Sequence, residues 1–443
     1  MQNMSNSGER KHMEFQRVDQ LLARFSELGA TRVFCKRLAE NDNHKQQIYL
    51  GGSFDVLSFF PFGTVREFAG QKKPNLKAAL DFYWITTTVA EQAPGAQLIL
   101  YPKYPEVRLS GFLRGCSVAP SEHMQPISAA NRKGRDTRVL IFGTTADRRT
   151  LAYLAPANSQ LATELVARFT ANKADGVFLE LTVAIGSASN RILLLAKLRE
   201  IHLVGYHDSM RLDKAGQTLP YIARNAGGTT LEALLGIRPN SLSAPDYLGW
   251  EIKGYGSDKI TLMTPEPNGG YYGENGVTAF VRKYGYTSSA DRLDFTGLHK
   301  LGSENRKTRL TLTQNGFNAD TNKIVDVDGA IALVDAKGSV AASWNIAKLL
   351  EHWNRKHAFA AYVPYTHRNT PSGYRYDSPV LLGEGTNFPK FLAALCSQHV
   401  AYDPGCKVEG LSTGKITQKA RSQFRISLKR LNVLYERIEP VDL

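Results

Sequence analysis

The chain has 443 residues, about three times the length of a typical domain, so two or three domains are expected rather than one small binding module. Hydrophobic residues (42%) and charged residues (22%) are near the averages for folded proteins, which excludes a disordered, collagen-like or coiled-coil chain. Lys and Arg outnumber Asp and Glu by 55 to 41, which gives a net charge of +14 at pH 7. Nucleic acid is the commonest partner of a strongly basic protein surface, although many basic proteins bind no nucleic acid.

The length of the hydrophobic runs and the spacing of the cysteines indicate where in the cell the protein is expected. The longest apolar runs are far shorter than the ~20 residues needed to cross a bilayer, and residues 1–13 are too polar for a signal peptide. Cys35, Cys116, Cys396 and Cys406 are scattered and form no C-x-x-C motif, which argues against a disulfide framework or a cysteine zinc site. We therefore expect a bacterial-type cytoplasmic protein that contacts no membrane.

The first third of the chain has mainly strand patterns. Residues 1–13 form a polar lead that is expected to be disordered. Apolar spacing predicts a helix over residues 18–28 that ends at Gly29. Short aromatic or β-branched runs then predict strands at residues 32–36, 46–50, 82–89, 97–101, 106–110 and 138–142. Short strands at this spacing are typical of a barrel or sandwich, so we expect a mostly β domain over residues 14–155.

The rest of the chain has mixed patterns. A helix that begins near Asn158 is expected within a linker of residues 156–184. Residues 247–253 and 259–263 alternate in hydrophobicity, which predicts two strands joined by a glycine-rich turn. Further helices are expected at residues 190–201, 229–235, 343–353, 388–397 and 419–436. Residues 185–443 are therefore expected to form a second, mixed α/β domain.

One predicted strand carries the side chains that most strongly suggest chemistry. Alternate residues of a strand share a face, so Glu251 and Lys253 point the same way while Ile252 turns into the core. Asp246 brings a second carboxylate to that edge if the chain bends at Leu248–Gly249. Two carboxylates and a backbone carbonyl are the hard oxygen ligands that Mg²⁺ prefers. The pattern therefore predicts a magnesium site.

A site of this kind suits hydrolysis of a phosphodiester. The metal polarises the phosphate and lowers the pKa of a bound water, and Lys253 can hold or help to deprotonate that water. The Glu-Ile-Lys triplet is weak evidence by itself, because the spacing is expected by chance about once in a chain of this length. The alternative for Glu251 and Lys253 is a surface ion pair worth ~0–1 kcal/mol. The preceding Pro245–Asp246 pair and Glu232 on a predicted helix favour the functional interpretation.

The order of these motifs resembles a known nuclease core. The chain contains Thr-Leu-Glu-Ala-Leu-Leu-Gly at 230–236, Pro-Asp-Tyr at 245–247 and Gly-Trp-Glu-Ile-Lys at 249–253. This order is similar to that of the PD-(D/E)XK nucleases, in the branch that contains MutH and the MvaI/BcnI restriction endonucleases. The similarity extends over roughly residues 185–440, but the segment between Gly205 and Gly227 departs from the pattern, so target specificity is not carried over.

The resemblance implies a role for each matching residue. Asp246 and Glu251, with the backbone carbonyl of Ile252, would bind one or two Mg²⁺ ions. Lys253 would be the catalytic lysine and Glu232 a supporting acidic residue. The implied architecture is a mixed α/β nuclease domain preceded by a mostly β DNA-binding domain.

The N-terminal part resembles a second family. Residues 36–50 and 104–112 are similar to the effector DNA-binding domain of EcoRII-type restriction enzymes, a B3-like pseudobarrel. Side chains in the first segment can reach phosphates and base edges, namely Arg37, Asn41, Asn43, Lys45 and Gln47. An Asn- and Asp-rich turn that caps strands is the alternative. Further candidate DNA contacts are Arg108, Arg211, His367, Arg368 and Arg425, the last on the basic helix expected at residues 419–436, whose charged face is otherwise simply solvated.

Together these features predict a type II restriction endonuclease that hydrolyses double-stranded DNA at a specific sequence with Mg²⁺. Its functional partner would be a cognate DNA methyltransferase of a restriction–modification system. One alternative is a MutH-like nicking or methylation-dependent endonuclease. Another is a non-catalytic DNA-binding protein built on the nuclease fold, against which the complete set of Asp246, Glu251, Lys253 and Glu232 argues.

Overall fold

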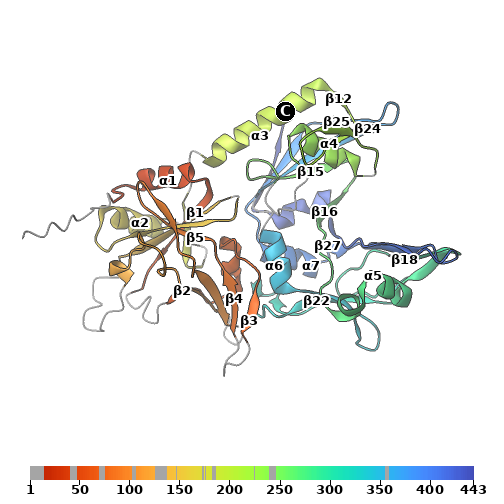
Figure 1. The fold of residues 1–443 in the computed structure, drawn as a ribbon, viewed down its shortest axis with the longest axis horizontal. Coiled ribbons are helices and arrows are strands. Elements are labelled where there is room, and N and C mark those ends of the chain that lie inside the picture. Colours follow the sequence, from red (N-terminus) through yellow and green to blue (C-terminus); the bar gives the residue numbers. More distant parts are fainter. Residues whose placement is uncertain are drawn as a thin grey trace, which may run out of the picture.

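The computed structural model describes residues 14–443 except for short segments at 40–46, 69–74, 102–105, 125–136, 146, 172–173, 175, 182–185, 224, 239–245 and 355–358. The chain forms two lobes, and the long helix α3 (Gly186–Val204) lies along the top of the view between them (Figure 1). Within the described residues, no helix has the length and apolar content required to cross a membrane.

Strands make up most of the N-terminal lobe. One six-stranded sheet has the order β11-β1-β9-β10-β5-β6, and a five-stranded sheet has the order β2-β8-β7-β4-β3. The first contains β1 (Ala30–Arg37), β5 (Phe82–Ile85), β6 (Ala90–Gln92), β9 (Val139–Thr145), β10 (Thr150–Ala155) and β11 (Phe178–Leu181). The second contains β2 (Gln47–Gly51), β3 (Arg66–Phe68), β4 (Asn75–Ala79), β7 (Gln97–Tyr101) and β8 (Glu106–Ser110). Only the β10–β5 pairing among these described strands is parallel.

The six-stranded sheet is buried on both faces. On one face Phe34 belongs to an aromatic cluster that includes Phe60, Phe142 and Phe178. On the other face α1 (Val18–Glu27) packs on β1, where Cys35 is buried, and α2 (Gln160–Ala171) packs on β9. A strand buried on both faces needs a continuous apolar run rather than alternation, which explains the Val-Phe-Cys sequence at 33–35.

The segment expected to be a linker contributes to this lobe. Residues 156–184 contain α2 and β11, and β11 pairs with β1 so that Leu181 lies opposite Val33. Phe178, Leu179 and Leu181 are buried, which explains why this short stretch adds a strand to the sheet. The exact division of the chain into domains stays a prediction.

The central sheet of the C-terminal lobe carries the candidate site. Its order is β12-β25-β24-β26-β31, and β15 adds to β24 in parallel. The strands are β12 (Tyr206–Asp208), β15 (Glu251–Tyr255), β24 (Phe359–Arg368), β25 (Gly373–Tyr376), β26 (Val380–Glu384) and β31 (Arg437–Val441). Apolar residues of α3 and of α4 (Ala226–Leu234), including Leu194, Leu198 and Leu231, cover one face against Ala361 and Val363. This lobe is mixed α/β, as the sequence predicted.

In the described part of this lobe there are also smaller sheets and three further α-helices. The small sheets are β13-β14, β16-β30-β27, β17-β18-β28-β29, β19-β22-β23 and β20-β21. Their strands are β13 (Met210–Leu212), β14 (Thr218–Pro220), β16 (Lys259–Met263), β17 (Tyr286–Ser289), β18 (Arg292–Thr296), β19 (Thr311–Gln314), β20 (Phe317–Asn318), β21 (Lys323–Ile324), β22 (Ala330–Val334), β23 (Val340–Asn345), β27 (Val400–Tyr402), β28 (Gly405–Glu409), β29 (Thr417–Lys419) and β30 (Phe424–Ser427). The helices are α5 (Gly270–Tyr284), α6 (Ile346–Asn354) and α7 (Phe388–Cys396).

The prediction of a basic helix at residues 419–436 is wrong. This stretch contains the end of β29, then β30, then a 3-10 helix at Leu428–Leu434. In β30 Phe424 and Ile426 are buried while Arg425 between them is half-buried, which is the period of a strand. The sequence pattern also fitted a helix because Phe424, Leu428 and Leu431 are spaced at three and four residues.

One further helix and the pairing of two strands also differ from the sequence-based prediction. The helix α5 was not predicted, because its sequence contains glycines of low helix propensity, and Gly276 interrupts it with φ 75°. The strands β15 and β16 both exist, but they do not pair as a hairpin, since β15 joins β24 while β16 joins β30. The chain therefore passes from one sheet to another directly after the Glu-Ile-Lys triplet.

The two lobes pack against each other through apolar surface. A 3-10 helix of the N-terminal lobe, Phe54–Phe59, contacts α6, α7 and β21 of the C-terminal lobe. Phe54, Leu57 and Phe59 are buried and belong to one hydrophobic cluster with Trp353 and Phe391. The core of the N-terminal lobe is thus continuous with that of the C-terminal lobe.

Candidate active site

The strand β15 holds a carboxylate and an ammonium in contact. The Nζ of Lys253 lies 2.8 Å from Oε1 of Glu251, and the two side chains are 17% and 4% exposed. Ile252 between them is buried in the core formed with α3 and α4. A buried carboxylate is stable only when a partner offsets its loss of hydration, and Lys253 supplies a positive charge at hydrogen-bond distance. The Glu251–Lys253 pair is therefore buried, unlike an ordinary surface ion pair.

A tight turn returns Asp246 to the same strand. Backbone hydrogen bonds of 3.0 and 2.8 Å link Tyr247 and Trp250 in both directions, and Leu248 (φ 50°) and Gly249 (φ 84°) form the turn between them. This is the bend that the sequence analysis required. Oδ2 of Asp246 accepts a hydrogen bond of 2.9 Å from the backbone N–H of Ile252. The Asp246 carboxylate is therefore fixed beside the strand that carries Glu251.

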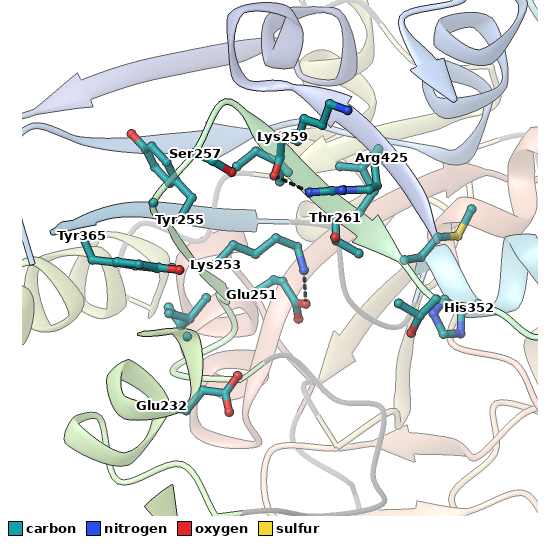
Figure 2. Close-up of a pocket in the computed structure, with 18 residues that line it drawn as sticks. Glu232, Glu251, Lys253, Tyr255, Ser257, Lys259, Thr261, His352, Tyr365 and Arg425 are labelled. Carbon is teal, nitrogen blue, oxygen red and sulfur yellow. Dashed lines mark hydrogen bonds and ion pairs between the residues drawn. The ribbon is translucent and has the colours of Figure 1, made fainter. Parts of the chain in front are cut away.

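A cavity of about 470 Å³ brings further charged side chains to this pair. Glu232 of α4 lines it together with Glu251 and Lys253, while Lys259, Thr261, His352 and Arg425 line the far part (Figure 2). The cavity wall thus combines two carboxylates with the cationic side chains of Lys253, Lys259 and Arg425. A cavity of this character suits an anionic substrate such as a phosphodiester.

Close backbone contacts set the position of α4. The hydroxyl of Tyr376 donates a buried hydrogen bond of 2.7 Å to the carbonyl of Gly227. A Cβ added to Gly227 would lie 2.5 Å from the Tyr365 ring, and one added to Gly254 of β15 would lie 3.3 Å from Cα of Gly228. The helix that carries Glu232 therefore approaches β15 as closely as it does because these positions lack side chains.

We expect Gly227→Ala to lower both stability and any activity of the site, because its methyl group must displace the Tyr365 ring or the helix. Overpacking of this kind costs about 1–3 kcal/mol. Gly228→Ala is the matched control, since a Cβ at that position meets nothing within 4 Å. Thermal unfolding of the two variants, compared with the unchanged chain, checks this result. Equal unfolding midpoints would contradict the close packing.

The donor set suits Mg²⁺, although it is small. Within the described ranges, no group of three or more His, Cys, Asp and Glu side chains is placed to hold a metal ion. The predicted set has two carboxylates, Asp246 and Glu251, and the carbonyl of Ile252. Mg²⁺ is commonly bound by one or two carboxylates and completes its shell with water and substrate phosphate oxygens. A bound ion would share these carboxylates with Lys253 and with the N–H of Ile252.

Arg425, proposed from sequence as a DNA contact, has partners within the protein. Its Nη1 donates to Oδ2 of Asp403 at 2.8 Å and its Nη2 donates to the carbonyl of Lys259 at 3.1 Å. The guanidinium nevertheless lines the cavity from β30 (Figure 2). Its contacts hold a positive charge at a fixed place in the cavity wall.

The other C-terminal candidates lie on two strands, with His367 and Arg368 at the end of β24 and Arg211 in the middle of β13. His367 stacks on Tyr374 with ring centroids 4.8 Å apart. The guanidinium of Arg368 lies 4.6 Å from the ring centre of Tyr206. Arg211 on β13 is exposed. His367 and Arg368 therefore each contact a tyrosine ring, Tyr374 and Tyr206 respectively, whereas Arg211 belongs to the separate β13–β14 pair.

The N-terminal candidates are only partly described. Arg37 is exposed at the end of β1. Nη1 of Arg108 donates to Oε1 of Gln47 at 3.3 Å across the neighbouring strands β8 and β2. The remaining candidates lie outside the described residues, namely Asn41, Asn43 and Lys45.

Several cavity residues were missed by sequence reasoning. Tyr365 and His352 lie more than 90 residues from Lys253 in the chain and reach the cavity only through the folding of β24 and α6. Lys259 lies on β16, close in sequence to Lys253, and its place on a predicted strand was the one signal that could have found it. Long-range pairing such as that of β15 with β24 leaves no local pattern.

Comparison with known proteins gives the following matches. The sequence profile of the MvaI/BcnI restriction endonuclease family matches residues 195–435. Among curated proteins nothing matches. A solved structure described as "Restriction endonuclease MvaI-cognate DNA substrate complex" is similar with 16% identity and a TM-score of 0.43, covering 56% of this chain and 97% of that one. Another, "Restriction endonuclease MvaI in the absence of DNA", is similar with 16% identity and a TM-score of 0.32, covering 57% and 97%.

Proposed function

This chain belongs to the MvaI/BcnI restriction endonuclease family and is a DNA endonuclease, and from that premise we propose that it cleaves double-stranded DNA at a specific sequence with Mg²⁺ as cofactor. The observation that carries the proposal is the buried Glu251–Lys253 pair in the wall of a cavity that also holds Glu232. The family profile covers the residues of this site.

The residues divide the chemistry between them. Asp246, Glu251 and the Ile252 carbonyl would hold the ion, and Glu232 would support it from α4. When bound, Mg²⁺ polarises the scissile phosphate and lowers the pKa of a water molecule. Lys253 orients the attacking water and neutralises charge that develops on the phosphate oxygens. The water oxygen bonds to phosphorus, the bond from phosphorus to the leaving oxygen breaks, and the leaving oxygen takes up a proton.

The direct test is digestion of plasmid DNA in Mg²⁺, using methylated and unmethylated preparations. Discrete fragments from unmethylated DNA alone are the expected result, and they would support a restriction enzyme with a cognate methyltransferase as its partner. Nicks, or cutting of methylated DNA only, would favour the MutH-like or methylation-dependent alternative. Intact plasmid under all conditions would leave a non-catalytic DNA-binding protein. Sequencing the fragment ends would then give the recognition site.

We further propose that the N-terminal lobe contacts DNA through a B3-like surface that includes Arg37, Gln47 and Arg108. The charge of this part supports the proposal, because 21 Lys and Arg against 14 Asp and Glu in residues 1–150 give it half of the net charge of +14. Arg108 and Gln47 are already in contact, which offers a guanidinium and an amide on adjacent strands. Such groups are able to form paired hydrogen bonds with guanine and adenine edges.

A salt titration tests the role of Arg37. If its guanidinium binds a phosphate, Arg37→Ala should weaken DNA binding about equally on all sequences and should reduce the slope of log K against log salt by about 1. Arg17→Ala is the control, because Arg17 is exposed, forms an ion pair with Asp19 and is not part of the proposed DNA surface. An unchanged slope for Arg37→Ala would remove this residue from the proposed DNA surface.

A further inference from the structure

Three glycines enclose the ring of Tyr365. A Cβ built on Gly227 of α4 would lie 2.5 Å from ring atom Cζ, and one on Gly256 would lie 2.6 Å from Cε2. A Cβ on Gly254 of β15 would lie 3.4 Å from Cδ1. Tyr374 packs edge-on against the same ring, with centroids 5.3 Å apart and planes at 87°. Side chains at these three glycine positions would occupy the space of the Tyr365 ring. The glycines therefore form a pocket that fixes the position of the ring.

The hydroxyl at the end of this fixed ring differs from those of the buried Tyr362 and Tyr376. Tyr376 donates to the carbonyl of Gly227, and Tyr362 shares a hydrogen bond with Tyr435. The Tyr365 hydroxyl forms no hydrogen bond with another residue in the described ranges. Tyr365 lines the cavity, and its hydroxyl end points toward the part occupied by Lys253 (Figure 2). A donor held rigidly at a polar cavity without a protein partner is suited to bind a ligand.

Tyr365 and Lys253 approach the cavity from opposite faces of the sheet. Ile252 and Val363 belong to the core under α4, and Tyr365 follows Val363 at the two-residue spacing that keeps it on that face. Lys253 lies on the other face of β15, which in the described part of the chain pairs only with β24. The two side chains therefore line the same cavity from opposite faces of the sheet.

The tyrosine is a neutral donor at any ordinary pH. Burial raises the pKa of Tyr365 above its usual value of 10. The phenol consequently keeps its proton across the neutral and mildly alkaline range. It can therefore donate a hydrogen bond throughout that range.

We propose that Tyr365 is a further catalytic residue, whose hydroxyl donates a hydrogen bond to a non-bridging oxygen of the scissile phosphate at the edge of β15. This inference rests on the proposed function. Negative charge on those oxygens must be stabilised as the attacking water adds, and a donor already fixed in place needs no reorganisation to do so. No bond to Tyr365 forms or breaks, and its proton remains on the phenol oxygen.

The test is Tyr365→Phe in the full chain, which keeps the ring in the glycine pocket and removes only the hydroxyl. The single-turnover cleavage rate in Mg²⁺ is expected to fall by about 10²-fold, the effect of losing one fixed donor. The affinity for the same duplex in Ca²⁺ and the midpoint of thermal unfolding are expected to stay unchanged. Tyr374→Phe is the matched control, since it removes a hydroxyl from the adjoining ring and should leave the rate unchanged.

The outcomes separate this inference from the proposed function. A Tyr365→Phe variant that cuts at the rate of the unchanged chain would overturn the role of Tyr365 and leave the endonuclease proposal intact. Equal losses in rate for Tyr365→Phe and Tyr374→Phe, or a matching loss of affinity or stability, would assign the hydroxyl a packing role and overturn it as well. Failure of the unchanged chain to cut DNA would instead refute the proposed function, and with it this inference.

Discussion

Lys253→Ala and Asp246→Ala are each expected to lower the single-turnover cleavage rate by about 10³-fold or more, with DNA affinity within a few-fold of the unchanged chain. In the proposed mechanism Lys253 acts on the attacking water and on transition-state charge, and Asp246 acts on the ion, so we expect neither to be needed for DNA binding. Rates are measured with enzyme in excess over a labelled duplex in Mg²⁺, and affinity is measured in Ca²⁺.

Two controls distinguish catalysis from folding. Lys197→Ala removes the lysine of another 2.8 Å ion pair, with Glu200 on α3, and should leave the rate unchanged. Removing Lys253 alone leaves a buried carboxylate, which typically costs about 3–5 kcal/mol. The double variant Glu251→Gln, Lys253→Met removes both charges and should recover stability but not cleavage. Wild-type rates in either single variant at the site would refute the assignment.

Removal of divalent metal is expected to stop cleavage completely, and Mg²⁺ or Mn²⁺ should restore it. Ca²⁺ should support DNA binding without turnover, because it accepts the same oxygen ligands but has a larger, looser shell and activates water less well. The measurement is digestion in excess EDTA followed by titration with each ion.

A measurement of thermal stability, which does not depend on activity, tests where the ion binds. Mg²⁺ should raise the thermal unfolding midpoint of the unchanged chain, because a ligand that binds only the folded state stabilises it. The rise should be smaller in Asp246→Ala and should persist in Gly228→Ala, which lies near the site but removes no carboxylate. Full cleavage in EDTA, or an identical rise in all three proteins, would be incompatible with the proposed metal ligands.

Local pattern was enough to predict the centre of the candidate site. The two-residue period puts Glu251 and Lys253 on one face with Ile252 in the core, and the Leu248–Gly249 dipeptide permits the turn that returns Asp246. These relations involve neighbours in sequence, so strand geometry and turn chemistry decide them. The catalytic roles of the residues stay predictions until the variants are measured.

Relations between distant segments could not be predicted in the same way. Tyr365 reaches the cavity because β24 pairs in parallel with β15 and because glycines on two other segments leave room for its ring. Arg425 lies on a strand rather than a helix because burial of Phe424 and Ile426 against the sheet outweighs an equally good helical spacing. In both cases tertiary packing selects among structures that the local sequence allows.

The apolar contact between the lobes has a consequence for the modularity of this enzyme. The 3-10 helix Phe54–Phe59 inserts into the same hydrophobic cluster as Trp353 and Phe391, so cutting the chain near residue 185 would expose that cluster to water. The family-matching part of the chain therefore does not form an independent module, and a fusion of it to a different N-terminal domain would have to cover the same apolar surface. The same contact fixes the distance between the N-terminal lobe and the candidate cavity, so a duplex bound to both as proposed would be held at one constant spacing.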